Sequence, residues 1–192
     1  MKKTAILLER LAALIHQSVR DDAVRHGLQP IHVQVLSYLA RANAYSDIPI
    51  AIAEYFGITR GTVSQSLKVL ERKGLLERRP DERHGRRIHL QVTSAGREVL
   101  DDGWAGRIEM ALQLVSESPD DLEQALRSLL TGLQRVNQQR PFGVCRHCVH
   151  FLAEAGGQRC GLTGEPLADR QIELICREWT DPTGTVTKKE KA

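Results

Sequence analysis

Residues 49–92 constrain the fold more than any other part of the chain, because their apolar spacing changes from helical to strand-like. A short apolar run ends at Gly57, a residue type that favours the conformation found just after a helix. A second helix follows Thr59, a natural N-cap, and its inward face carries Val63, Leu67 and Leu70. Two strands joined by the turn "PDERHG" are then predicted, the second from the alternation of Ile88, Leu90 and Val92. This order of elements predicts a winged helix-turn-helix.

Basic residues gather on the same run, although the whole chain is nearly neutral. Residues 59–87 hold nine Lys or Arg against four Asp or Glu, whereas the net charge of all 192 residues is only +3. A local concentration of positive charge is typical of a surface that meets phosphates. Side chains on the tip and polar face of the second helix would reach base edges, and those of the hairpin would reach the backbone. The candidate DNA-binding residues are Arg60, Gly61, Thr62, Ser64, Gln65, Lys68, Arg72, Arg83, Arg86 and Arg87.

The segments "IAEYFGITRGTVSQSLKVLERKGLLERRPD" and "RRIHLQVTSAGREVL" resemble the MarR family of transcription regulators. The resemblance covers about residues 5–138 and implies a homodimer with interleaved terminal helices, bound to a pseudo-palindromic double-stranded DNA operator. It also implies that Arg86 is the wing arginine and that bases are read by Arg60, Thr62 and Gln65. The family usually has Asp two residues before the wing arginine, where this chain has His84. A winged helix that serves only as a scaffold for protein contacts stays open as an alternative.

Amphipathic helices are predicted on both sides of this unit, at residues 4–20 and from Pro30 onward. A long helical pattern starts at Thr93, and its apolar face carries Leu100, Trp104, Ile108, Leu112 and Val115. A last helix opens at Ser118 and Pro119. Trp104 and Met110 would lie in a core or line a ligand cavity. The acidic pairs at 21–22, 101–102 and 120–121 are expected on exposed helical faces or at helix ends.

The predicted fold class is mainly α with a small β wing, in a winged helix-turn-helix dimer with a small metal-stabilised C-terminal module. A MarR-like dimerisation and DNA-binding domain spans 1–138, with its winged unit at about 31–93. The break "QQRPFG" leads to a cysteine module at 144–180 and a flexible tail at 181–192. Charged residues in the first helix argue against a signal peptide or membrane span, so we expect a cytoplasmic protein without a membrane partner. No phosphate loop or nucleophile motif occurs, so we predict no enzyme activity, and no small-molecule effector is evident.

All four cysteines lie in the last quarter of the chain, with the spacing C-x2-C-x11-C-x15-C. In a cytosolic protein such a group binds a metal more often than it forms disulfides. The first two thiols fit one tight turn, whereas a structural zinc ribbon normally uses two such pairs. The candidate metal ligands are Cys145, Cys148, Cys160 and Cys176, and His147 or His150 could replace a thiol. So short a module is expected to need its metal to fold.

The pattern C-x-x-C-x-x-F, C-x-L-x-x-G and C-x-x-W, which ends in Phe151, "CGLTGEPL" and "CREW", resembles high-potential iron–sulfur proteins. The resemblance implies that the four thiols hold a 4Fe–4S cluster beside shielding aromatic rings. We therefore expect a DNA-binding regulator whose operator affinity follows redox state or iron supply. Two alternatives stay open: a similar regulator with a purely structural zinc ion, and a cluster-carrying electron-transfer or adaptor protein that does not act on DNA.

Overall fold

The computed structural model describes residues 2–81, 87–101, 103–115, 118–154 and 157–182. Contacts divide the chain into two compact units, each considered by itself below. The winged-helix unit consists of residues 1–41 and 47–123, and the cysteine unit consists of residues 42–46 and 124–192. The short segment 42–46 thus counts with the C-terminal residues, although in sequence it joins two helices of the winged-helix unit.

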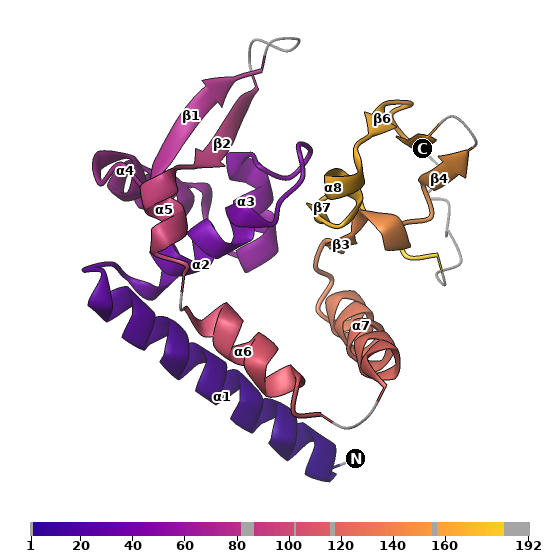
Figure 1. The fold of residues 1–192 in the computed structure, drawn as a ribbon, viewed down its shortest axis with the longest axis horizontal. Coiled ribbons are helices and arrows are strands. Elements are labelled where there is room, and N and C mark those ends of the chain that lie inside the picture. The colour runs from indigo at the N-terminus through magenta and orange to yellow at the C-terminus, as the bar shows by residue number, and fades with distance from the viewer. Residues whose placement is uncertain (1, 82–86, 102, 116–117, 155–156, 183–192) are drawn as a thin grey trace. The chain divides into compact units, whose positions relative to one another are not determined.

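The described residues of the winged-helix unit form helices and one hairpin (Figure 1). Its helices are α1 (Lys2–Arg25), α2 (Pro30–Ala40), α3 (Pro49–Phe56), α4 (Arg60–Arg72), α5 (Ser94–Glu98), α6 (Trp104–Leu112) and the start of α7 (Pro119–Val136). The antiparallel hairpin consists of β1 (Leu76–Pro80) and β2 (Ile88–Val92), with Leu76 opposite Val92 and Pro80 opposite Ile88. Helix α2 is central, since it contacts α1, α4, α5 and β2.

The predicted helix-turn-helix and hairpin are confirmed. Gly57 follows α3 in the left-handed region, at φ 63°, where a side chain would be strained. The hydroxyl of Thr59 caps α4 by accepting a hydrogen bond from the backbone N–H of Thr62 at 3.1 Å. The face of α4 that turns into the core carries Val63, Ser66, Leu67 and Leu70. Local spacing and capping therefore decide this part of the fold.

The prediction of one long helix from Thr93 is wrong, because a turn separates α5 from α6. Gly103 precedes α6 with an extended backbone, and a side chain there would come within 2.8 Å of the Leu100 carbonyl oxygen. The first N–H group of α6, that of Trp104, donates to Oδ2 of Asp22 at 2.7 Å. A carboxylate from α1 thus caps the start of α6 across the core.

Asp22 was expected on an exposed helical face or at a helix end. It lies in the last turn of α1 and caps α6, but it is buried rather than exposed. Its side chain is only 1% exposed and accepts a hydrogen bond from Arg107 at 2.8 Å as well as one from Arg25. Burial raises the pKa of Asp22, but the hydrogen bonds from Arg107, the Trp104 backbone and Arg25 outweigh it, so the pKa lies below the ordinary value. Buried carboxylates require such partners, which here come from three separate positions.

Helix α1 is longer than predicted, and most of its apolar residues are exposed in the single chain. Those exposed on α1 include Ile6, Leu7, Leu11 and Leu14. Exposed apolar side chains on α7 include Leu126, Leu130, Leu133 and Val136. No helix among the described residues is long and apolar enough to span a membrane.

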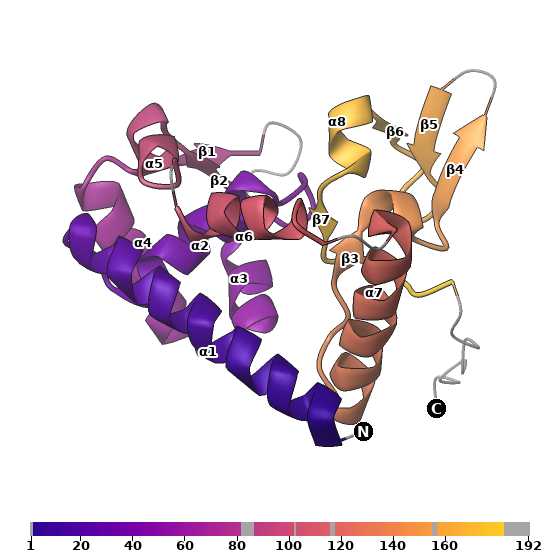
Figure 2. The same ribbon diagram turned by 60° about the horizontal axis from the view of Figure 1, so that its bottom comes forward.

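The cysteine unit combines the rest of α7 with short strands and turns (Figure 2). Its further elements are β3 (Gly143–Val144), the 3-10 turn η1 (Cys145–His147), β4 (Phe151–Glu154), β5 (Gly157–Cys160), β6 (Pro166–Leu167), α8 (Asp169–Ile172) and β7 (Ile175–Cys176). Strand β3 pairs with β7, and β4, β5 and β6 form a three-stranded antiparallel sheet. Trp179 packs so closely on Gly143 that a Cβ atom there would lie 2.5 Å from the indole ring.

Candidate DNA-binding surface and cysteine site

The face of α4 opposite the core is polar and open. Every predicted DNA-binding residue on this helix is exposed: Arg60, Gly61, Thr62, Ser64, Gln65, Lys68 and Arg72. The N-terminal turn of α4 carries the residues with hydrogen-bonding side chains, and its C-terminal half carries Lys68 and Arg72. A helix that protrudes in this way can enter a major groove with its first turns while its cations meet phosphates.

The hairpin adds fewer free cations than the sequence suggests. Arg78 is paired with Glu71 at 2.6 Å and Arg79 with Glu77 at 2.6 Å, so part of the positive charge is neutralised locally. Arg87 is half-buried. The predicted wing residues Arg83 and Arg86, together with His84, lie outside the described residues.

A histidine held between two carboxylates lies where the hairpin meets the segment before α3. Nδ1 of His89 is 2.6 Å from Oδ1 of Asp47, and its Nε2 is 3.0 Å from Oδ2 of Asp81. Burial lowers the pKa of His89, but hydrogen bonds to both carboxylates outweigh this, so the pKa lies above the ordinary value. This network was not predicted, because Asp47 and His89 lie 42 positions apart in the sequence.

The four cysteines meet in one apolar core. Cys145 and Cys176 are buried in it, and Cys148 and Cys160 pack against it together with Tyr45 and Phe151. Backbone pairing explains this convergence: Gly143, two residues before Cys145, lies opposite Cys176, and Phe151, three residues after Cys148, lies opposite Cys160. All four are free thiols.

Burial and mutual proximity act on the charge state of these thiols. Burial, and after it the like charges of the nearby Cys176, Cys148 and Cys160 thiolates, raises the pKa of Cys145 to about 12. Burial also raises the pKa of Cys176. Four thiolates in such a core would need a bound cation to offset their charge, and soft thiolate sets suit zinc or an iron–sulfur cluster. Among the described residues, however, no three Cys, His, Asp or Glu side chains form a ready-made site for one metal ion.

Several donors already point at the sulfur atoms. The backbone N–H of Thr180 donates to Sγ of Cys148 at 3.3 Å. The backbone N–H of Glu178 and the side chain of Asn43 both lie close enough to Cys176 to lower its pKa against the effect of burial. The Nδ2 atom of Asn43 is buried and, among the described residues, has no hydrogen-bond acceptor of standard geometry. A metal-bound thiolate would supply the acceptor that this amide lacks, so the amide is compatible with a bound metal or cluster.

His147, which was considered as a ligand in place of a thiol, is engaged otherwise. Arg127 on α7 donates to its Nε2 atom at 3.0 Å, and its backbone oxygen accepts a hydrogen bond from the Trp179 indole at 2.9 Å. The buried Trp179 is thereby fixed against the core that contains the cysteines. His150 is half-buried.

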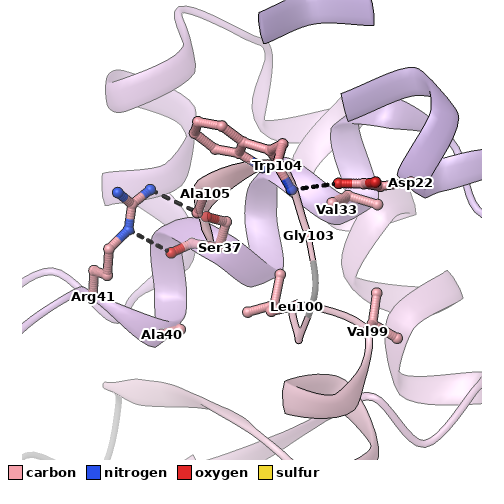
Figure 3. Close-up of a pocket in the computed structure, with 10 residues that line it drawn as sticks. All are labelled: Asp22, Val33, Ser37, Ala40, Arg41, Val99, Leu100, Gly103, Trp104 and Ala105. Atoms are coloured by element: carbon pink, nitrogen blue, oxygen red, sulfur yellow. Dashed lines mark hydrogen bonds between the residues drawn. The ribbon is translucent and has the colours of Figure 1, made fainter. Parts of the chain in front are cut away.

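A small cavity of about 130 Å³ lies in the winged-helix unit between α2 and the turn before α6 (Figure 3). Trp104 and Met110 were expected either in a core or in a cavity wall. Trp104 lines this cavity, whereas the Met110 side chain is 68% exposed. Arg41 lies 6.0 Å from the centre of the Trp104 ring and donates to the carbonyl oxygen of Ser37 at 3.0 Å. Leu100, on the same predicted apolar face, lines the cavity together with Trp104.

Comparison with known proteins agrees with this geometry. Residues 26–87 match the model of the MarR family. Over 141 residues the chain is 27% identical to the transcriptional repressor MprA of Escherichia coli K12, a match that covers 69% of this chain and 80% of MprA. The crystal structure of an S. aureus MepR–DNA complex is 25% identical, with a TM-score of 0.50, over 68% of this chain and 96% of MepR.

A second MepR structure, in its DNA-binding conformation, shows the shared fold, with a TM-score of 0.56 at 23% identity over 70% of this chain and 98% of that chain. About 70% of the present chain thus accounts for nearly the whole of these structures. The family match ends at residue 87, far before the first cysteine. Residues 26–87 are therefore similar in sequence to the MarR family, and about 70% of the chain shares the winged-helix fold of these structures.

Proposed function

We propose that the protein is a homodimeric regulator that binds a double-stranded DNA operator through α4 and the hairpin, and that the cysteine unit adjusts its affinity. The observation that carries the DNA-binding part is the open polar face of α4, with Arg60, Thr62 and Gln65 exposed on its first turns. The similarity to MepR, which has been crystallised on DNA, supports the same use of this helix.

Binding to DNA from the protein's own upstream region tests this part, by gel shift or footprinting at several salt concentrations. Arg60→Ala is expected to weaken binding, and if Arg60 contacts a phosphate it lowers the slope of log affinity against log salt by about 1. Arg170→Ala, an exposed arginine on α8, is the matched control and should leave both quantities unchanged. Equal affinity of the Arg60 variant and the control would contradict this use of α4.

Gly61 offers a second test that separates folding from DNA contact. Among the described residues, a Cβ atom at this position would meet only the Thr59 hydroxyl, at an ordinary 3.6 Å, so Gly61→Ala is accommodated in the free protein. Alanine also favours the helix over glycine by about 1 kcal/mol. A variant that is more stable yet binds DNA more weakly would indicate that the DNA backbone or bases approach Gly61 closely.

Dimerisation is supported by the exposed apolar faces of α1 and α7. Side chains such as Leu7, Leu11, Leu130 and Leu133 are each half or more exposed in the single chain. Exposed apolar helix faces of this kind are typical of a protein interface. Light scattering after gel filtration should give twice the mass of the chain, and Leu11→Glu should shift the protein toward the monomer. A monomeric wild-type protein would contradict the proposal.

For the cysteine unit we propose that Cys145, Cys148, Cys160 and Cys176 hold a 4Fe–4S cluster, with a structural zinc ion as the alternative. Such a cluster would supply a centre that responds to oxidants and to iron supply. The support is the convergence of four free thiols in one core and the donors aimed at their sulfur atoms. Anaerobic purification followed by iron, acid-labile sulfide and zinc analysis distinguishes the two. Iron and sulfide in equal amounts support the cluster, whereas one zinc per chain and no iron would overturn it.

A further inference from the structure

Segment 42–46 is built into the cysteine unit by a set of hydrogen bonds around β7. The backbone N–H of Asn43 donates to the carbonyl oxygen of Ile175 at 3.0 Å. Directly after β7, the backbone N–H of Arg177 donates to Oγ of Ser46 at 2.7 Å. The two residues bonded to the segment, Ile175 and Arg177, flank Cys176 in the sequence. Segment 42–46 therefore holds the backbone on both sides of this buried cysteine.

The orientation of the Asn43 amide follows from its neighbours. Its Oδ1 atom accepts hydrogen bonds from the Ser46 hydroxyl at 2.8 Å and from the backbone N–H of Tyr45 at 3.1 Å. Both partners are donors toward this atom, which assigns it as the oxygen and leaves Nδ2 as the other end of the amide. Asn43 is 1% exposed, and its Nδ2 is the donor that lacks an acceptor of standard geometry among the described residues.

A buried amide donor without an acceptor is costly in a folded protein, and a bound ion is one of the recognised reasons for keeping such a group. Cys176 lies between Ile175 and Arg177, the two residues whose backbone groups bond to segment 42–46. A neutral thiol is a weak acceptor, whereas a thiolate is a strong one. When a metal replaces the thiol proton, which leaves to solvent, Cys176 becomes the acceptor that Asn43 lacks.

We infer that Asn43 is a positioning residue of the cysteine site, which donates an N–H···S hydrogen bond to the metal-bound thiolate of Cys176. The inference rests on the proposed metal site and adds a residue from outside the cysteine module to it. It also suggests how a metal at the cysteine site would influence DNA binding. Ser46 is followed within three residues by Pro49, the first residue of α3, so the segment that senses the thiolate leads directly into the helix-turn-helix.

Tyr45 strengthens this link. Its ring packs against the core that contains the cysteines, and its hydroxyl donates to Oε2 of Glu165 at 2.5 Å. Glu165 also accepts the backbone N–H of Cys160 through its carbonyl oxygen at 2.9 Å. Segment 42–46 therefore contacts the surroundings of two of the four thiols, those of Cys160 and Cys176.

The test is the Zn²⁺ affinity of the full-length, metal-stripped chain, measured by competition with a chelator. Asn43→Asp keeps the oxygen that accepts from Ser46 and Tyr45, and replaces only the donor; Asn43→Ala removes both. Both variants are expected to bind Zn²⁺ about 10- to 100-fold more weakly than the wild type, as when other outer-shell partners of a metal site are lost. Asn137→Asp and Asn137→Ala, at an exposed position after α7, are the matched controls and should bind like the wild type.

Affinity for operator DNA in the metal-free state shows that the variants are folded, since it should equal that of the wild type. In protein reconstituted with an iron–sulfur cluster, the Asn43 variants should have a more negative reduction potential, because N–H···S bonds stabilise the extra negative charge of the reduced state. If Asn43→Asp binds Zn²⁺ as tightly as Asn137→Asp, the inference is overturned while the metal site stands. If the wild type binds neither Zn²⁺ nor a cluster, the proposed site falls, and the inference with it.

Discussion

Replacing Asp22 by alanine is expected to loosen the attachment of α6 to the rest of the winged-helix unit. Asp22 is buried on α1 and caps the first N–H group of α6, that of Trp104, at 2.7 Å. The same carboxylate holds Arg107 on α6 at 2.8 Å. Alanine would leave the Trp104 N–H without its acceptor and Arg107 without this ion pair.

The magnitude follows from these two contacts. A hydrogen bond to a charged group contributes about 1.5–3 kcal/mol to stability. The Arg107 side chain is 44% exposed, so solvent screening limits its ion pair to about 1 kcal/mol or less. Asp22→Ala should therefore lower the unfolding free energy by about 2–4 kcal/mol. Asp22→Asn keeps an oxygen for the Trp104 N–H and should lower it by roughly half as much.

Two measurements check this expectation. Urea unfolding, followed by far-UV circular dichroism, gives the change in stability. Amide hydrogen exchange over α6 should become about 30- to 1,000-fold faster in Asp22→Ala, since each 1.4 kcal/mol is a factor of ten. The neighbouring Asp21 is exposed, so Asp21→Ala is the matched control. If the two alanine variants differed by less than about 0.5 kcal/mol, the size of ordinary surface effects, the capping role of Asp22 would be refuted.

The lowered pKa of Asp22 predicts how its contribution to stability changes with pH. The pKa of this carboxyl is lowered in the folded state, so the unfolded chain takes up the proton first as the pH falls. The stability that Asp22 adds is thus fully present above its unfolded pKa of about 3.9 and is lost as the pH falls through the lower folded value. The difference between wild type and Asp22→Asn should be constant from pH 7 to 5 and shrink below pH 4.

Four further variants test local contacts. Thr59→Ala removes the N-cap of α4 and should cost about 1 kcal/mol of stability in urea unfolding, whereas no change would argue against the cap. Gly96→Ala places a Cβ atom 2.1 Å from the Leu75 carbonyl oxygen and should destabilise the protein by more than about 2 kcal/mol. A Cβ atom at Gly132 meets nothing within 4 Å among the described residues, so Gly132→Ala should stabilise the protein by about 0.5–1 kcal/mol. His89→Gln should cost most below about pH 6.5 and less as the pH rises through the raised folded pKa of His89, so a cost that grows with pH would contradict the carboxylate pairing.

The winged helix could be predicted from sequence because its information is local. The cap at Thr59, the stop at Gly57 and the apolar spacing of α4 each act over a few residues, and the structure has them where the pattern indicates. The exposed face of α4 follows from the same spacing. Such features depend on backbone propensity and amphipathicity, which a single sequence displays directly.

The features that escaped prediction depend on contacts between distant residues. The cap of α6 comes from Asp22, 82 positions before Trp104, so the periodicity from Thr93 suggested one uninterrupted helix. The bond from Arg177 to Ser46 spans 131 positions and connects a loop without any cysteine to the cysteine unit. Asn43 and Ser46 are also common residues of turns, so their composition gave no sign of a second role.

Operator affinity with and without the bound metal or cluster tests the central proposal most directly. The wild-type chain, purified without oxygen, would be compared with the same chain after the metal or cluster has been removed, on one operator and at one salt concentration. We predict affinities that differ by at least about tenfold, the range of typical allosteric coupling. Equal affinities in the two states, with DNA binding intact, would contradict regulation through the cysteine unit.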